Sequence, residues 1–242
     1  MDLDDTTVVH GRENLPSRAV TEAIAKAKDL LHVSIATART LKDSMKIINH
    51  LSLSGPCVCT NGTQIYDPVE KSILHEVILP HDVITPLIDM CKKYQLEAIV
   101  YDGFKDSVYD GTQSHEKVLT LYIPEVPIKK IDEYVKEFSI DPRIHVQKLT
   151  AWDKSFMSLD IASSGASKLH GIVKVAEILG IKTEEMIGVG DGYNDFSLLM
   201  ACGLKIAMGN AVPELKEIAD FVAPTVYDDG VATVIEKFIL ES

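Results

Sequence analysis

Two short acidic stretches contain the residues whose types and spacing are best suited to chemistry. The first is DLDDT at residues 2–6, and the second is GDGYND at residues 190–195. The second stretch places Asp191 directly after an apolar run and Asp195 four residues later, with two glycines that permit tight turns and close approach of a ligand. Carboxylate oxygens gathered in this way suit a hard cation such as Mg²⁺, which prefers a few protein carboxylates together with water and phosphate oxygens.

The two stretches have complementary uses in one kind of reaction. Asp2 is ionised at neutral pH, so it can act as a nucleophile without a separate base. Its attack on a phosphate dianion is opposed by charge repulsion, which a bound metal ion removes. Asp4 could protonate the leaving oxygen and later deprotonate the attacking water. Each stretch also has an ordinary interpretation: an acidic chain end, and a Gly-Asp turn in which Asn194 or Asp195 caps a helix.

Two further polar side chains fit the same chemistry. Lys168 offers a point charge that can orient a nucleophilic carboxylate and a phosphoryl oxygen. Thr37 offers a hydroxyl and a backbone amide to the same phosphate. Taken singly, each residue is typical of a surface or helix-capping position. All four segments, however, lie just beyond the end of a predicted strand, and ligands bind at that edge of an open parallel sheet.

The elements that must position these residues alternate between helix and strand in the first and last parts of the chain. Residues 16–31 have apolar positions at helical spacing, and residues 33–37 are short, apolar and β-branched, as in a buried strand. A predicted helix at 40–51 and a strand ending at the Asn61-Gly62 turn continue the alternation, which resumes near residue 167. Such alternation is typical of a parallel sheet with helices on its faces.

The middle of the chain has a different pattern. Beyond residue 70, predicted strands follow one another in pairs, with helices near 82–94 and 127–138. This pattern indicates an antiparallel sheet covered on one face. We therefore predict an α/β protein: a Rossmann-like parallel-sheet core formed by residues 1–70 and 164–242, with an α+β domain inserted at residues 71–163.

The composition narrows the class of protein. The net charge of −12 over 242 residues argues against a nucleic-acid partner, although a metal ion can supply the positive charge that a phosphorylated small molecule needs. Four cysteines without CxxC spacing are expected to be reduced and mostly buried. No apolar run reaches the ~18 residues that span a bilayer, and the acidic start differs from a basic signal peptide. We expect a cytoplasmic protein, monomeric or homodimeric, without a membrane or nucleic-acid partner.

The four segments together resemble the motifs of the haloacid dehalogenase-like superfamily of phosphohydrolases. Residues 2–6 resemble its first motif, Asp-x-Asp-(Gly or Asp)-Thr, and Thr37-Ala38-Arg39 resembles the second, commonly Thr-Gly-Arg. Lys168 matches the third motif, and residues 190–195 match the fourth without departure. The motifs follow the family's order over nearly the whole chain, and the inserted domain resembles the large α/β cap of the Cof-like branch.

The resemblance implies a role for each matching residue. Asp2 would be the nucleophile that becomes a phosphoaspartate, and Asp4 the general acid and base. The implied phosphate-binding residues are Thr37, Lys168, Asn61 and Asn194. Mg²⁺ would be the cofactor, and its implied site comprises Asp2, Asp191, Asp195 and Asp4, the last through its backbone carbonyl. The cap would close over the core and select the substrate.

These expectations define a function and its alternatives. We expect a magnesium-dependent phosphomonoester hydrolase that acts on a small phosphorylated metabolite, such as a sugar phosphate, through an aspartyl-phosphate intermediate. A phosphomutase or phosphotransferase of the same superfamily is the alternative within the enzymes. A non-catalytic phospho-ligand-binding relative is a third alternative, because the family has an apolar strand before the nucleophile whereas only Met1 precedes Asp2. The neighbours of that strand are expected to lack backbone partners.

Overall fold

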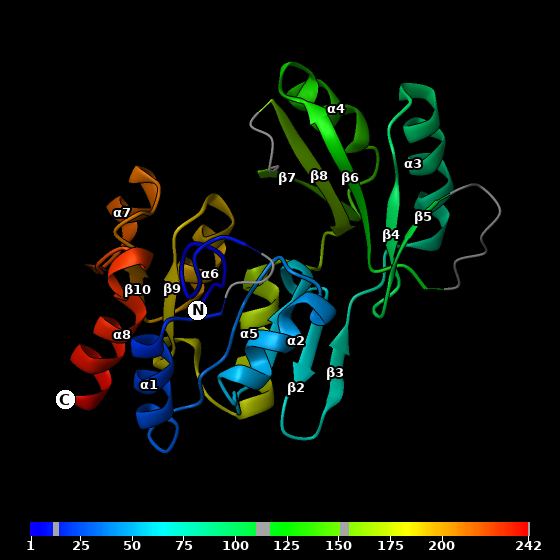
Figure 1. Ribbon diagram of the computed structural model, residues 1–242. Helices are drawn as coiled ribbons and strands as arrows, with labels where there is room; N and C mark the ends of the chain where they lie inside the picture. The colour runs from blue at the N-terminus through cyan, green and yellow to red at the C-terminus, as the bar shows by residue number, and fades with distance from the viewer. Residues whose placement is uncertain (12–14, 110–116, 151–154, 242) are drawn as a thin grey trace. The chain divides into compact units, whose positions relative to one another are not determined.

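The computed structural model describes residues 1–11, 15–109, 117–150 and 155–241, which form two compact units. The first unit comprises Met1–His75 and Ser167–Ser242, and the second comprises Glu76–Ala166. Figure 1 shows that both ends of the chain belong to the first unit. The second unit is therefore an insertion into the first.

A three-stranded parallel sheet forms one part of the first unit. Its strand order is β11-β10-β9, with bounds β9 (Ile187–Gly190), β10 (Leu204–Ala207) and β11 (Phe221–Val222). The helices of this part are α5 (Lys168–Leu179), α6 (Phe196–Ala201), α7 (Pro213–Ile218) and α8 (Gly230–Ile235), which continues as a π-helical turn at Glu236–Leu240. Helices thus separate successive parallel strands, in agreement with the predicted alternation.

The other part of the first unit contains two helices and a second three-stranded sheet. The helices are α1 (Arg18–Ala27) and α2 (Leu41–His50), and the sheet has the order β1 (Cys57–Cys59), β2 (Gln64–Asp67) and β3 (Ser72–Glu76). Each helix is preceded by an N-cap residue with a hydroxyl group. The Ser17 hydroxyl accepts a hydrogen bond from Val20 N, and the Thr40 hydroxyl accepts one from Asp43 N. Each cap satisfies a backbone donor that the first helical turn leaves free.

The first two residues of the chain lie beside the parallel sheet. Asp2 N donates to Val189 O at 2.9 Å on one side, and Ala36 N donates to Met1 O at 2.8 Å on the other. The neighbours of this position were expected to lack backbone partners, but Val189 O and Ala36 N each have one here. Met1 and Asp2 connect β9 to the segment that ends at Thr37.

The segment 33–37, predicted as a strand, is paired only briefly with β1. Val58 N donates to Ile35 O at 2.8 Å and Thr37 N donates to Val58 O at 2.9 Å, which makes a single parallel bridge at Ala36. The segment is not a regular strand, because its pairing with the three-residue strand β1 is limited to one bridge, between Ala36 and Val58. Thr37 nevertheless lies directly beyond the bridge, as the sequence predicted for a site residue at a strand end.

Leu3 anchors the acidic stretch 2–6 in the core of the first unit. Its side chain is fully buried and belongs to the same apolar core as Val8. The backbone N–H groups of Thr6, Thr7 and Val8 all donate to Leu3 O, at 3.3, 2.8 and 2.9 Å. An apolar residue between two acidic ones therefore closes and fixes the loop that carries both predicted catalytic aspartates.

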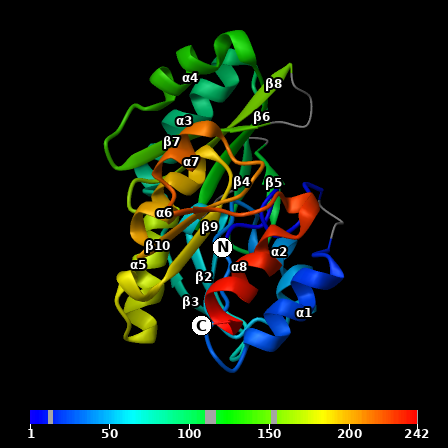
Figure 2. The same ribbon diagram turned by 90° about the vertical axis from the view of Figure 1, so that its left-hand side faces the viewer.

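The second unit is an antiparallel sheet with two helices. The strand order is β5-β4-β6-β8-β7, and every neighbouring pair is antiparallel. The elements are α3 (His81–Tyr94), β4 (Ile99–Tyr101), β5 (Asp106–Val108), β6 (Thr120–Pro127), α4 (Ile131–Phe138), β7 (Ile144–Thr150) and β8 (Phe156–Ser163). Figure 2 shows both helices on the same side of this sheet, where they share an apolar core with the strands.

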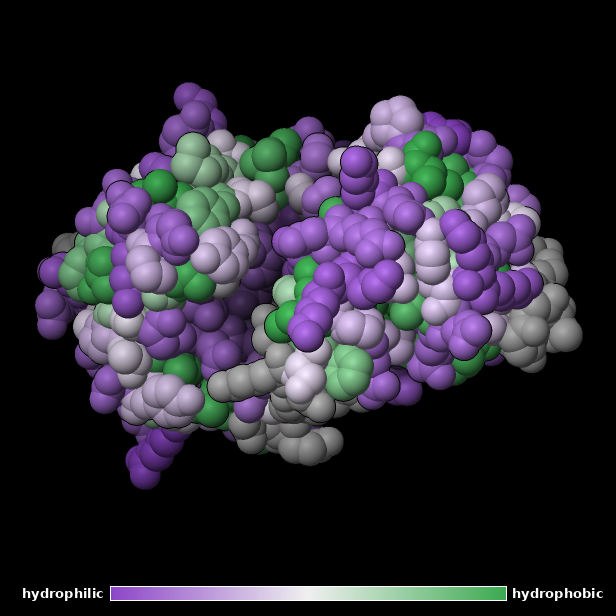
Figure 3. Space-filling view, turned by 90° about the horizontal axis from the view of Figure 1, so that it is seen from above, coloured by the Kyte–Doolittle hydropathy of each residue, from purple (hydrophilic) through white to green (hydrophobic). Residues whose placement is uncertain are grey.

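Apolar residues, including the four cysteines, form the buried core of each unit. On the face shown in Figure 3, hydrophobic side chains are scattered among hydrophilic ones, as on most globular proteins. All four cysteines are buried free thiols, as predicted. Within the described ranges, no helix is both long and apolar enough to cross a membrane.

A left-handed run of backbone at residues 60–62 supports the start of α5. Thr60, Asn61 and Gly62 have φ values of 50°, 51° and 99°, a sequence that is costly for a β-branched residue such as Thr60. A Cβ added at Gly62 would lie 2.1 Å from Ser167 O, so only glycine permits this approach. The run therefore packs its backbone directly against the residue that precedes Lys168.

We expect Gly62→Ala to lower the free energy of unfolding by about 3 kcal/mol or more, because the new Cβ collides with backbone and φ is positive. Gly180→Ala is the matched control, since Gly180 also has positive φ (67°) but nothing within 4 Å of the added Cβ. Its expected loss is about 1 kcal/mol. Urea unfolding of both variants measures the difference, and equal losses would contradict the close-approach explanation.

Candidate active site

A buried lysine joins two of the predicted site aspartates. Lys168 Nζ donates to Asp2 Oδ1 and to Asp195 Oδ1, both at 2.6 Å. All three side chains are at least nine-tenths buried. Burial lowers the pKa of Lys168, but the charges of Asp195 and Asp2 outweigh this effect and raise the pKa above its ordinary value. The lysine is therefore a fixed positive charge beside the predicted nucleophile.

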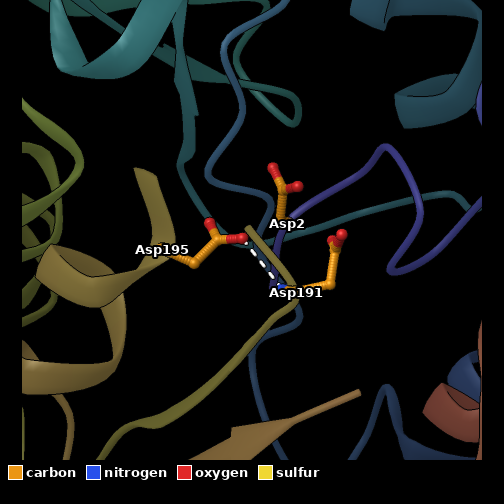
Figure 4. A group of neighbouring side chains, drawn as sticks. All are labelled: Asp2, Asp191 and Asp195. Carbon is orange, nitrogen blue, oxygen red and sulfur yellow. Dashed lines mark hydrogen bonds between the residues drawn. The ribbon is translucent and has the colours of Figure 1, made fainter. Parts of the chain in front are cut away.

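The GDGYND loop folds around Asp195. Asp191 N and Gly192 N both donate to Asp195 Oδ2 at 3.0 Å, and Figure 4 shows the bond from Asp191. A Cβ added at Gly190 would lie 2.5 Å from Asp195 Cβ, so a glycine is needed there. Asp195 makes no side-chain cap to α6 and instead caps its own loop while binding Lys168. Asp195 thus stabilises the Gly-Asp turn of its own loop, and its membership of a metal site stays a prediction.

Asp191 is the third acid of the group. Its Oδ1 accepts a hydrogen bond from Thr6 Oγ1 at 2.6 Å. Among the described residues, Asp2, Asp191 and Asp195 form a possible metal-binding group in which one oxygen of each lies within 4.8 Å of the others. Figure 4 shows the carboxylate of Asp2 beside those of Asp191 and Asp195, which belong to a single loop.

Burial of these acids shifts their proton affinities upward. Burial, reinforced by Asp195, raises the pKa of Asp2 to about 7, although Lys168 opposes the shift. Burial also raises the pKa of Asp191 to about 8; the Thr6 hydrogen bond opposes this shift, and the neighbouring carboxylates Asp2 and Asp195 add to it. Both shifts mean that the protein alone does not supply enough positive charge for three ionised carboxylates.

The charge balance fits a divalent cation. Three ionised carboxylates and one ammonium leave a net charge of two minus, and carboxylate oxygens are the hard ligands that Mg²⁺ prefers. The oxygens of Asp195 already accept three hydrogen bonds. Asp2 and Asp191 would therefore be better placed than Asp195 to bind a metal ion directly, because Asp195 already holds the loop and the lysine.

Asp4 is paired with Arg39 and is not a member of this group. Arg39 Nε donates to Asp4 Oδ2 at 2.8 Å, and Arg39 Nη2 donates to Asp4 Oδ1 at 2.5 Å. His10 Nδ1 lies 3.4 Å from Asp4 Oδ1. The Asp4 carboxylate is not one of the three clustered acids, so its predicted metal contact, through the backbone carbonyl, stays a prediction.

The predicted phosphate-binding residues differ in how they lie. Thr37 is buried, and its Oγ1 accepts from Arg39 N at 3.1 Å, which leaves the hydroxyl proton for another acceptor. Asn61 is also buried and donates its backbone N–H to Thr37 O at 2.9 Å. Asn194 is half-buried in the loop beside Asp191. Contact of these residues with phosphate stays a prediction.

Two residues with evident structural roles received none from the sequence. Thr6 binds Asp191 across 185 positions of sequence, and Arg39 binds Asp4 across 35. Both lie inside motifs recognised in the sequence, the last residue of DLDDT and the last of Thr37-Ala38-Arg39. Their places in those motifs were the available signal, but only the fold shows which acid each residue contacts.

A sequence model of the haloacid dehalogenase-like hydrolase family matches residues 1–141 and 114–235. The chain belongs to this family of hydrolases, as the four motifs predicted. The predicted α/β class with an inserted domain is likewise confirmed by solved structures of the same fold. One is a haloacid dehalogenase-like hydrolase from Bacteroides thetaiotaomicron, with a TM-score of 0.84 and 24% identity over 98% of this chain and 97% of that one.

Curated relatives span nearly the same length. A 5-amino-6-(5-phospho-D-ribitylamino)uracil phosphatase of Bacillus subtilis is 27% identical over 99% of this chain and 94% of its own. A phosphoglycolate phosphatase of Methanopyrus kandleri is 30% identical over 86% of this chain and 83% of its own. The predicted enzyme class, a hydrolase whose named relatives are phosphatases, is confirmed.

We expect Mg²⁺ to stabilise the protein more at high pH than at low pH. The pKa of Asp191 is about 8 against an ordinary 3.8, so the folded form binds this proton more tightly than the unfolded chain. The metal-free protein should therefore lose stability as pH rises toward about 8, and protonated acids should compete with the metal. Thermal unfolding should show a Mg²⁺ shift of about 5 °C at about pH 9 and under about 1 °C at about pH 5.5.

Asp191→Asn is the control for this pH effect, because it removes both a titrating group and a predicted metal ligand. The variant should show no Mg²⁺ shift at either pH. A shift of equal size at both pH values in the unmodified protein would contradict the metal site.

We expect Thr6→Val to weaken Mg²⁺ binding about 10-fold, since the hydroxyl that orients Asp191 is lost while the shape is kept. Titration calorimetry measures the affinity. Thr6→Ser keeps the donor and should bind Mg²⁺ within about 2-fold of the unmodified protein. Equal affinities for the valine and serine variants would show that the hydrogen bond does not orient the ligand.

Proposed function

We propose that this chain is a magnesium-dependent phosphomonoester hydrolase that acts on a small phosphorylated metabolite through an aspartyl-phosphate intermediate. The observation that carries the proposal is the buried ion pair between Lys168 and Asp2, with Asp191 beside it. An aspartate held in place at one oxygen by a buried ammonium is a positioned nucleophile, and correct placement is a large part of catalysis.

The two aspartates of the first loop divide the proton and phosphoryl transfers between them. Lys168 binds Asp2 Oδ1, which leaves Oδ2 as the attacking atom. Oδ2 bonds to phosphorus as the ester P–O bond breaks, and Asp4 gives a proton to the departing oxygen. Asp4 then takes a proton from water as the water oxygen attacks phosphorus, which releases inorganic phosphate and restores the Asp2 carboxylate.

The phosphoryl group is bound by the remaining predicted residues. The Thr37 hydroxyl accepts from Arg39 N, so its own proton is directed to another acceptor, which in this proposal is a phosphoryl oxygen. Lys168 contributes positive charge, and Asn194 and Asn61 are further candidates for contact. These donors would hold the phosphorus atom in line with the attacking oxygen.

The residues that would hold Mg²⁺ are Asp2 and Asp191, with Asp195 and the backbone carbonyl of Asp4 as further predicted members of the site. Bound Mg²⁺ would neutralise the phosphate and the nucleophile together. Because the pKa of Asp2 is raised to about 7, a nearby cation also favours the ionised nucleophile at neutral pH.

The class of substrate is a small phosphorylated metabolite such as a sugar phosphate. The relatives named above act on a phosphorylated ribitylamino-uracil and on phosphoglycolate, which share a phosphomonoester and little else. As part of the same proposal, the unit Glu76–Ala166 is the cap domain that selects the substrate. A cytoplasmic location and a monomeric or homodimeric state remain predictions.

The rival functions differ in what receives the phosphoryl group. A non-catalytic role would be consistent with a loosely held Asp2, whereas Asp2 is buried, backbone-paired and ion-paired, which supports turnover. A phosphomutase or phosphotransferase would pass the group to a sugar hydroxyl. Trapped phosphoenzyme mixed with water or with sugars separates these cases by the rate of inorganic phosphate release.

We expect Asp2→Asn to abolish Mg²⁺-dependent release of phosphate from p-nitrophenyl phosphate, with a loss of at least about 10⁴-fold in kcat, because the amide cannot form the acyl phosphate. A phosphate-release assay measures the loss, and mass spectrometry of quenched enzyme should show the phosphoryl adduct only when Asp2 is present.

Asp89→Asn is the control, because this acid is exposed and its pair with Lys92 is long, at 3.9 Å. It should leave kcat within about 2-fold of the unmodified value. Full activity in Asp2→Asn would rule out the proposed nucleophile.

A further inference from the structure

Arg39 grips the Asp4 carboxylate at both oxygens. Its Nε and Nη2 atoms reach the two oxygens at 2.8 and 2.5 Å, and its side chain is only 9% exposed. A two-point contact between a planar guanidinium and a planar carboxylate fixes the rotation of the carboxylate as well as its position. One lysine or one histidine could not fix both.

Arg39 is itself fixed by the neighbouring backbone. Its N–H donates to Thr37 Oγ1 at 3.1 Å, and its carbonyl accepts from Thr60 N at 2.8 Å. Its Nη2 also donates to Gly11 O at 3.2 Å. The arginine therefore links the first-motif loop to the segment that carries Thr37 and to the left-handed run at 60–62.

The contact is not arranged for greatest stability. Arg39 Nη1 is buried and has no hydrogen-bond partner among the described residues. A buried donor left unpaired costs about 1–3 kcal/mol, which a fully satisfied or apolar side chain would avoid. The arrangement therefore fixes both oxygens of Asp4 while one donor of Arg39 remains unpaired.

The other cation beside Asp4 cannot supply this orientation. His10 approaches one oxygen at 3.4 Å, and its side chain is 48% exposed. A single long contact at an exposed site has little effect on geometry. Among the described cationic side chains that pair with Asp4, Arg39 is the one with the required two-point geometry.

We propose that Arg39 is a positioning residue that holds the Asp4 carboxyl group in the orientation needed to transfer a proton to the departing oxygen. The inference rests on the proposed function, since it assigns Asp4 the acid and base steps. Arg39 acts through Asp4 and not on phosphorus, so its loss should matter most where the leaving oxygen most needs a proton.

Two aryl phosphates provide the test, because they share a ring but differ in leaving group. Phenyl phosphate releases a basic phenolate, whereas p-nitrophenyl phosphate releases a stable anion that needs little protonation. In Arg39→Gln, kcat/KM should fall about 30-fold for phenyl phosphate and under about 3-fold for p-nitrophenyl phosphate. Arg39→Lys keeps the charge without the fork and should fall between the unmodified protein and Arg39→Gln for phenyl phosphate.

A double-mutant comparison shows whether Arg39 acts through Asp4. In an Asp4→Asn background, Arg39→Gln should change kcat/KM for phenyl phosphate by less than about 2-fold, since the group it positions is already gone. Arg18→Gln, which breaks the exposed pair with Glu22, is the matched control and should leave both substrates unaffected. Circular dichroism and thermal unfolding verify that each variant is folded.

Equal losses for the two substrates, or a full additional loss in the Asp4→Asn background, would overturn the inference and make Arg39 a structural residue. Those results leave the proposed hydrolase activity standing, because the unmodified protein still turns over both substrates. Failure of the unmodified protein to hydrolyse either substrate with Mg²⁺ would instead overturn the proposed function and this inference with it.

Discussion

The interaction on which the rest of the structure depends is the buried ammonium of Lys168 between Asp2 and Asp195. A buried charge is costly unless it is paired and hydrogen-bonded, and removing one partner of such a pair typically costs about 3–5 kcal/mol. Here the pairing is mutual, because each acid also needs the lysine. The three side chains therefore tie together the first loop, the start of α5 and the loop after β9.

The surrounding fold can be understood as support for these three charges. Leu3 fixes one side of Asp2 in the apolar core, and Met1 and Asp2 pair with Val189 and Ala36. Gly62 lets the left-handed run pack closely against the backbone of Ser167, the residue that precedes α5. These supporting contacts are made by backbone atoms or by apolar side chains. The polar side-chain atoms of Lys168, Asp2 and Asp195 are therefore left for binding and chemistry.

Much of this arrangement could be predicted from the sequence, and there is a physical reason why the other contacts could not. The alternation of helices and strands predicted the parallel sheet. The polar residues at strand ends predicted that Asp2, Lys168, Asp191 and Asp195 lie close together. The fork from Arg39 to Asp4, the hydrogen bond from Thr6 to Asp191 and the backbone pairing of Met1 could not be predicted. All three depend on the rotation of a side chain or on a neighbour distant in sequence, which local patterns do not specify.

The residues that meet at the candidate active site are far apart in sequence, which affects how the site forms during folding. Lys168 and Asp2 are 166 positions apart, and Thr6 and Asp191 are 185 apart, with a unit that has its own apolar core between them. Contacts of this kind close slowly, because the entropy of a long loop must be overcome before they form. The inserted unit can thus fold before the contacts between Lys168 and Asp2 and between Thr6 and Asp191 have formed. In the proposed mechanism, activity therefore requires that the last third of the chain has joined its first few residues.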